Sequence, residues 1–110
     1  MRMHAKREGG ALRLVFGGCP AIDSVNAAAV KAEALRLIAE ATDVIVDLSG
    51  VEFIDSAGVG VLVGLFKALR QRGGRARFCG LSAGVRSVIE IIRLDRIFEI
   101  YDDAASAASA

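Results

Sequence analysis

The chain has 110 residues, a formal net charge of +1 and 54% hydrophobic residues. This length fits one domain, and this composition fits a packed globule rather than a disordered tail. The balanced charge offers no general attraction to nucleic acid or to an anionic membrane. No apolar leader opens the sequence, and its longest uncharged run, 56–66, is shorter than the roughly 20 residues that cross a bilayer. We therefore expect a soluble cytoplasmic protein without membrane insertion.

The first elements are predicted to be a β-hairpin and a helix. Two short runs flank Gly9 and Gly10, a dipeptide suited to a two-residue turn. The first run is polar, which suits an exposed edge of a sheet. Apolar residues then recur at helical spacing over 24–41, and either Asp23 or Ser24 can cap that helix.

The rest of the chain alternates strands with helices. The β-branched run 43–51 shows no polar alternation, which is typical of a strand covered on both faces in a parallel sheet. The later elements are a glycine-containing helix ending near Arg72, a strand at 75–80, a helix capped by Ser82, a strand at 96–101 and, at 103–110, a short helix or a frayed tail. This order predicts a single α/β domain over 1–110, with flanking helices on a mostly parallel sheet of four to five strands and an antiparallel N-terminal edge.

The reactive residue types do not form a recognisable enzyme site. The turn at Ser56 departs from G-x-S-x-G because Ile54 occupies the first glycine position, and the sole histidine, His4, is distant in sequence. Cys19 and Cys79 lie outside any metal-ligand spacing and are predicted to be buried thiols. We therefore expect no catalytic residues and no bound metal.

Nucleotide binding is also disfavoured. Gly58, Gly60 and Gly64 follow a strand and open a helix, but their spacing is G-x-G-x-x-x-G and no acidic residue stands near position 80 to hold a ribose. The carboxylates around this turn have no histidine partner, and Asp55 is explained more simply as a helix cap. The basic stretch 67–77 lacks interleaved aromatic residues and is interpreted as a solvated helix end rather than a nucleic-acid site.

The helix that begins at Ser56 is apolar on two sides. One stripe has bulkier side chains and is predicted to face the core; it consists of Val59, Leu62, Val63, Phe66 and Leu69. The opposite stripe is flatter and consists of Ala57, Val61, Gly64, Leu65 and Ala68. Either a neighbouring helix or another protein has to cover this second stripe.

Ser56 stands where free N–H groups and the helix dipole favour an anion. A phosphate there would be tolerated by the fold, yet it would place about −1.5 to −2 charges on an apolar patch. A partner docking on that patch would then have to desolvate the phosphate. From the residues alone, this serine is either a simple N-cap or a position that is neutral for folding and decisive for association.

The segment from Val44 to Tyr101 resembles a STAS domain, and more narrowly the bacterial anti-sigma-factor antagonists. The stretch "DLSGVEFIDSAGVG" is similar to the family's D-L-S-x-V-x-F-x-D-S-S-G-L-G, and "RLDRIFEIY" is similar to a tail that reads "GLDRIFEIY". The residues before Val44 agree with the family in element order only. Two departures are the alanine at position 57, where the motif has a second serine, and a longer loop at 17–23.

The resemblance implies a phosphorylation switch with Ser56 as the acceptor, because the family's acceptor is the serine directly after the motif aspartate. The unphosphorylated form would bind an anti-sigma factor, usually an ATP-dependent serine kinase, and thereby free the sigma factor. The kinase would then phosphorylate and release the antagonist, and a phosphatase would reset it. ATP would belong to the kinase, so this chain would need no cofactor of its own.

The resemblance also implies which residues contact the partner: Asp23, Asp55, Ala57, Gly58, Val59, Gly60, Val61 and Leu65. In this scheme Asp55 caps the helix or orients Ser56, and the glycines permit close approach of another backbone. Two other roles stay open: a STAS subunit of a phospholipid-type membrane transport complex, and a partner-switching module for a target other than sigma. The sequence specifies no oligomeric state.

Overall fold

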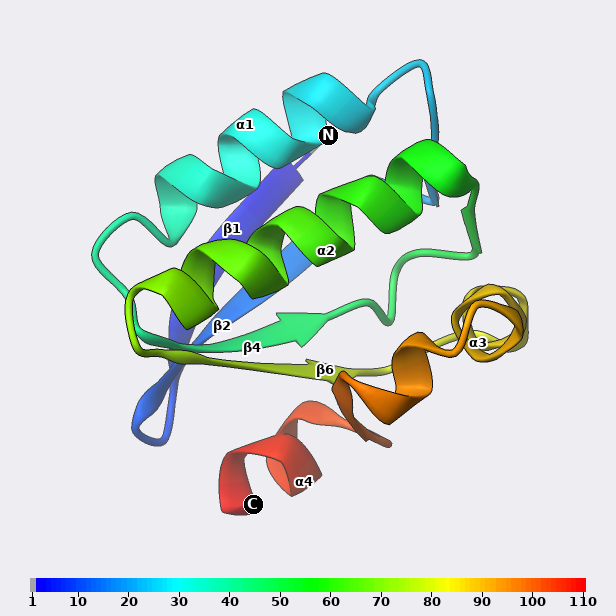
Figure 1. Cartoon of the computed structure of the whole chain (residues 1–110). Helices are drawn as coiled ribbons and strands as arrows, with labels where there is room; N and C mark the ends of the chain where they lie inside the picture. The colour runs from blue at the N-terminus through cyan, green and yellow to red at the C-terminus, as the bar shows by residue number, and fades with distance from the viewer. Residues whose placement is uncertain (1) are drawn as a thin grey trace.

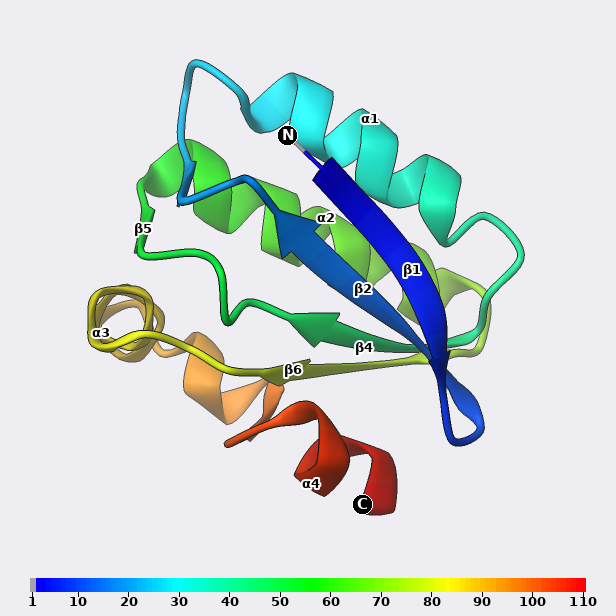
Figure 2. The same ribbon diagram turned by 180° about the vertical axis from the view of Figure 1, so that it is seen from behind.

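The computed structural model describes residues 2–110 as one central sheet with helices on both faces (Figures 1 and 2). The elements, in chain order, are β1 (Arg2–Glu8), β2 (Ala11–Gly17), β3 (Ala21–Ile22), α1 (Ala27–Leu37), β4 (Asp43–Asp47), β5 (Phe53–Ile54), α2 (Ser56–Gln71), β6 (Arg75–Cys79), α3 (Ala83–Ile91), the 3-10 turn η1 (Leu94–Arg96), β7 (Glu99–Tyr101) and α4 (Ala104–Ser109).

The main sheet has the strand order β1-β2-β4-β6-β7. Only the β1–β2 pair is antiparallel, and the other three pairs are parallel. Gly9, with φ +63°, supplies the left-handed residue of the β1–β2 turn. The α/β fold with a mostly parallel sheet and an antiparallel N-terminal edge is therefore confirmed.

One face of the sheet carries the main core. Side chains of β2, β4 and β6 that point to this face pack against α1, α2 and α3, and the fully buried ones include Leu14, Val46 and Phe78. Phe98 stacks on Phe78 with 4.1 Å between ring centroids, so the segment before β7 closes this layer. In Figure 1, α1 and α2 lie side by side over this face, whereas α4 lies on the opposite side.

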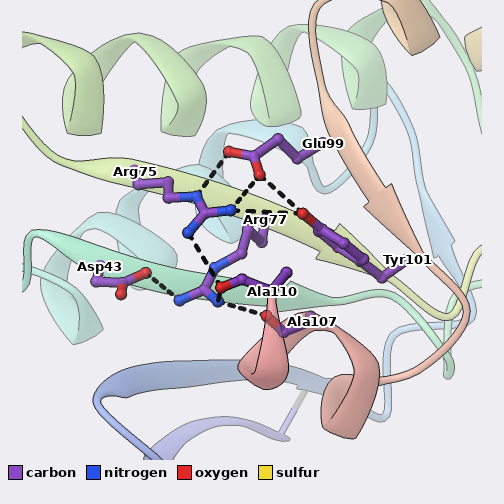
Figure 3. A network of polar contacts seen from close by, with 7 residues as sticks. All are labelled: Asp43, Arg75, Arg77, Glu99, Tyr101, Ala107 and Ala110. Atoms are coloured by element: carbon purple, nitrogen blue, oxygen red, sulfur yellow. Dashed lines mark hydrogen bonds and ion pairs between the residues drawn. The ribbon is translucent and has the colours of Figure 1, made fainter.

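The opposite face of the sheet is polar and is tied together by arginine–carboxylate pairs (Figure 3). Arg77 is buried, and it donates to Asp43 and to the carbonyl oxygen of Ala107 in α4. Arg75 pairs with Glu99 on the neighbouring strand. A small apolar cluster, which includes Ile45 and Cys79, fills the space beneath α4. Charge pairing thus fixes the position of a helix that buries little apolar surface.

Most element predictions are confirmed, including Ser82 as the cap of α3, where its hydroxyl accepts from the Val85 amide at 3.2 Å. The predicted cap of α1 is wrong, because the helix begins at Ala27 and its N-cap residue is Asn26, which makes no side-chain cap hydrogen bond. Neither Asp23 nor Ser24 caps it; the Asp23 carboxylate accepts from the Val25 and Asn26 amides in the turn before the helix. The 103–110 segment forms α4. Three short elements, β3, β5 and η1, were not predicted.

Both cysteines are buried free thiols, as predicted. Within residues 2–110, no helix combines the length and the apolar character that a membrane crossing requires.

Candidate functional site

Two short strands bring distant segments together at the start of α2. β3 pairs with β5 in parallel, which places Ala21 opposite Phe53. The Glu52 and Phe53 amides donate to the Pro20 carbonyl at 2.7 and 3.2 Å. The loop before α1 therefore lies beside the turn that leads into α2, at one corner of the molecule (Figure 2).

Asp55 connects these segments through both oxygens of its carboxylate. Oδ1 accepts from the Ala57 and Gly58 amides at 2.9 and 3.0 Å, which caps α2. Oδ2 accepts from the Ser24 amide at 3.1 Å, which holds the preceding loop. The amide hydrogen bonds, that of Gly58 foremost, lower the pKa of Asp55 below its ordinary value. The predicted role of Asp55 as a helix cap is confirmed, and the cap is ionised at neutral pH.

Gly58 is the point of closest approach between the two segments. A Cβ at this position would lie 2.2 Å from the carbonyl oxygen of Ile22, so only glycine fits here. A Cβ at Gly60 would meet no atom within 4 Å, because that position faces solvent. The close approach predicted for these glycines thus occurs within this chain at Gly58, while Gly60 leaves its surface open.

Ser56 is exposed at the first position of α2, directly after the cap. Two large apolar side chains near this turn are also open to solvent: Val25 is 93% exposed and Phe53 is 54% exposed. Val25 follows the Ser24 amide that Asp55 holds, and Phe53 lies three residues before Ser56. Apolar surface next to a reachable hydroxyl suits a site where a second protein binds.

The first predicted stripe of α2 lies in the core or packs against it, as expected, and of the two alternatives for the second stripe the neighbouring helix, α1, is the one found. The prediction that Val61 and Leu65 contact a partner is wrong. Val61 and Leu65, expected as partner contacts, are 2% and 0% exposed and belong to the core. The buried side of α2 lies between the two predicted stripes, because the helix packs on the sheet and on α1 at once. The close contact between Gly64 and Lys31 of α1 marks this second interface.

The outer line of α2 is what remains available to another molecule near Ser56. It runs from Ser56 through Gly60 and half-buried Val63 to Lys67. Ala57 and Val59 are half-buried at the flanks of the helix, and Asp23 is half-buried in the loop. The exposed apolar pair Val25 and Phe53 was missed, although two apolar residues in polar loops are a signal that could have indicated it.

No group of residues suited to a metal ion occurs within 2–110. The Cys79 thiol is not a reactive group either, because burial, assisted by the Asp47 carboxylate, raises its pKa to about 12. The α2 corner therefore offers the exposed serines Ser56 and Ser24, both close to the Asp55 carboxylate, and Ser56 is the one at the start of the helix.

Comparison with known proteins agrees with this arrangement. The family model for the STAS domain matches residues 3–107. The chain belongs to the STAS domain family. An anti-sigma-B factor antagonist of Listeria monocytogenes is 42% identical over 81 residues, which cover 72% of this chain and 70% of that protein. An anti-sigma F factor antagonist of Paenibacillus polymyxa is 31% identical over 64 residues, covering 58% of this chain and about half, 55%, of that protein.

The fold is also shared with solved STAS structures. The crystal structure of a putative anti-sigma factor antagonist from Thermotoga maritima superposes with a TM-score of 0.86 at 25% identity, covering 97% of this chain and 92% of that chain. This STAS likeness extends over the N-terminal hairpin and loop, where the sequence motifs are weakest.

Proposed function

We propose that this chain is an anti-sigma-factor antagonist, acting as one STAS unit over residues 1–110, and that phosphorylation of Ser56 switches its binding to an anti-sigma factor. The observation that carries the proposal is the exposed Ser56 hydroxyl beside the exposed apolar side chains of Val25 and Phe53. The names of the most similar relatives give the class of partner. Ser56 is the serine of the family motif, and a kinase could reach it without unfolding the chain.

The switch would work by charge. A phosphate on Ser56 would stand next to the ionised Asp55 carboxylate and on the same surface as Val25 and Phe53. A partner covering that surface would have to desolvate a dianion, which opposes binding. The α2 dipole partly offsets the new charge in the free chain, so folding is affected much less than association.

In this proposal the chain has a passive role in the phosphoryl transfer. The kinase supplies ATP and the catalytic groups, and this chain supplies the hydroxyl in a position fixed by the Asp55 cap. A phosphatase acting on the same exposed position would reset the switch.

The test is a titration of the purified chain with the anti-sigma factor kinase of its source organism. Ser56→Asp is expected to weaken binding by about 100-fold, equivalent to roughly 2.7 kcal/mol. Ser56→Ala is expected to keep binding and to gain no phosphate when it is incubated with kinase and ATP, as judged by intact mass.

The matched control is Ser87→Asp, which adds the same charge at an exposed serine of α3. It should leave the affinity near that of the unchanged chain. Calorimetry separates function from folding, because Ser56→Asp should shift the unfolding midpoint by less than about 2 °C. Phosphate on the Ser56→Ala variant, or loss of binding with Ser87→Asp, would contradict the proposal.

A further inference from the structure

A shallow groove of about 580 Å³ lies along the second half of α2, remote from Ser56. Phe66, Lys67, Arg70 and Gln71 of α2 line it, together with Ile97 from the segment after η1. Ile97 is 57% exposed. The Phe66 ring is held in place by Phe98, with 5.2 Å between ring centroids. The groove therefore has an apolar floor built on a fixed aromatic ring.

Two cations line this apolar floor, and two more lie close to Ile97 in the sequence. The Arg70 guanidinium lies 5.5 Å from the centroid of the Phe66 ring, and Lys67 stands on the same helix. Arg96 is the last residue of η1 and immediately precedes Ile97, and Arg93 is the residue before η1. The ion pairs found among residues 2–110 include none of these four cations. Asp95 is the single acidic residue of the η1 turn, so a net positive charge remains on a chain whose total is only +1.

Arg93 adds an independent observation. Its φ is +66°, the left-handed conformation that glycine adopts without strain and other residues rarely adopt. It follows the end of α3, where a left-handed glycine is the usual helix stop, and the similar family tail has glycine at this position. This chain thus keeps a cationic side chain four residues before Ile97, at a position where the backbone favours glycine.

We propose that this groove is a second docking site, which takes a protein segment carrying one large apolar side chain flanked by Asp or Glu residues. The apolar side chain would pack on Phe66 and Ile97, and the carboxylates would face Lys67, Arg70, Arg93 and Arg96. Charge complementarity of this kind selects an acidic partner and speeds encounter.

The groove is independent of the phosphorylation switch. Phe66 follows Ser56 by ten residues on one helix, a distance of about 15 Å along the axis. That separation exceeds the Debye length of about 10 Å at 0.1 M salt, so a charge on Ser56 is largely screened from the groove. The chain could therefore stay attached to one protein through this groove while Ser56 controls a different contact.

The test uses three synthetic 12-residue peptides and the isotope-labelled full chain, observed by NMR. The first peptide has a central tryptophan flanked by glutamates, the second replaces the glutamates with lysines, and the third replaces the tryptophan with serine. Only the first is expected to bind and to shift the amide signals of 66–71 and 93–97. Affinity is expected to fall by about tenfold when both Lys67→Glu and Arg70→Glu are introduced.

Arg7→Glu is the matched control, because it reverses an exposed cation on β1 far from the groove. It and Ser56→Asp should each change the affinity by less than about twofold. Arg93→Gly should weaken binding of the first peptide by about threefold. It should also raise the unfolding midpoint of the chain by about 2–4 °C, because glycine adopts the left-handed conformation without strain. A variant that binds the peptide more weakly but unfolds at a higher temperature would show that Arg93 contributes to docking and not to folding stability.

Several outcomes would overturn the proposal. These are equal binding of the lysine peptide, amide shifts confined to other elements, or no binding of the glutamate–tryptophan peptide at millimolar concentration. Stronger perturbation of the groove by phosphatidylglycerol vesicles would point to a membrane instead. Concentration-dependent self-association through 66–71, measured by light scattering, would assign the groove to a second copy of the chain.

Discussion

The two faces of the central sheet are held by different forces. The face beneath α1 and α2 carries the main apolar cluster, which includes Val44, Val46 and Phe78. The face beneath α4 carries arginine–carboxylate pairs, among them those of Arg13 and Arg77. Burial of apolar area dominates folding stability, whereas ion pairs near a surface add little net free energy. The comparison teaches that one face keeps the chain folded and the other mainly determines where its polar partners and α4 lie.

The largest effect is expected from the apolar face. Leu62 of α2 is fully buried, and Leu62→Ala should lower the free energy of unfolding by about 2–5 kcal/mol, through lost burial and the cavity that remains. Urea denaturation followed by circular dichroism measures it. Val63→Ala on the same helix is the control, because Val63 is only half-buried and should cost less than about 1 kcal/mol. Equal losses for the two variants would contradict this account of α2.

An intermediate effect is expected from Asp47 on the polar face. Its carboxylate accepts two hydrogen bonds from Arg13, at 2.9 and 2.5 Å, and one from the Ser49 amide at 3.0 Å. Asp47→Ala should lower the free energy of unfolding by about 2 kcal/mol. The loss is smaller than for a fully buried ion pair, because the Arg13 side chain is 25% exposed and can be solvated. Asp47→Asn keeps an acceptor for the Ser49 amide and should cost less.

The pH dependence sharpens this prediction. Burial acts to raise the pKa of Asp47, but the Ser49 amide and Arg13 outweigh it, so the pKa lies below its ordinary value. The stability that this carboxylate contributes is therefore present above its unfolded pKa of about 4 and is lost as pH falls through the lower folded pKa. Asp47→Asn should flatten the acid limb of a stability–pH curve. A slope unchanged from the original chain would count against this role.

The smallest global effect is expected from Arg77. Arg77→Met removes one partner of an ion pair, but the Asp43 carboxylate that it leaves is 38% exposed and can be solvated, so stability should change by about 1 kcal/mol or less. The substitution also removes the hydrogen bond to the Ala107 carbonyl, and the α4 amides should therefore exchange hydrogen faster. Arg36→Met, which breaks an exposed pair with Glu33, is the control and should leave α4 exchange unchanged. Strong global destabilisation by Arg77→Met would contradict the comparison of the two faces.

The sequence predicted the elements whose signals are local. A glycine dipeptide indicated the hairpin, a β-branched run indicated β4, and Ser82 indicated the start of α3. β3 and β5 could not be predicted, because two residues show no periodicity and their pairing joins segments about thirty residues apart. The prediction that Val61 and Leu65 face a partner was wrong for a related reason. A helix with apolar residues on most of its circumference does not show which side meets the sheet until the position of α1 is known.

The candidate site also has a part that the sequence predicted and a part that depends on the tertiary structure. The motif around Ser56 indicated an exposed turn and a capping aspartate, and the structure has both. The apolar surface beside it depends on the loop that carries Val25, which only the β3–β5 pairing brings to this corner. Side chains contributed by a distant loop have no signature in the motif itself.

The contact between Gly58 and the Ile22 carbonyl has an evolutionary consequence. The two segments around the serine meet through backbone atoms, with the backbone amides of Ser24 and Gly58 bound to one carboxylate. Side chains such as Val25 and Phe53 project from this frame without supporting it. Duplicated copies of such a gene could therefore diverge in their choice of partner by exchanging these projecting groups, while each copy inherits an unaltered hydroxyl.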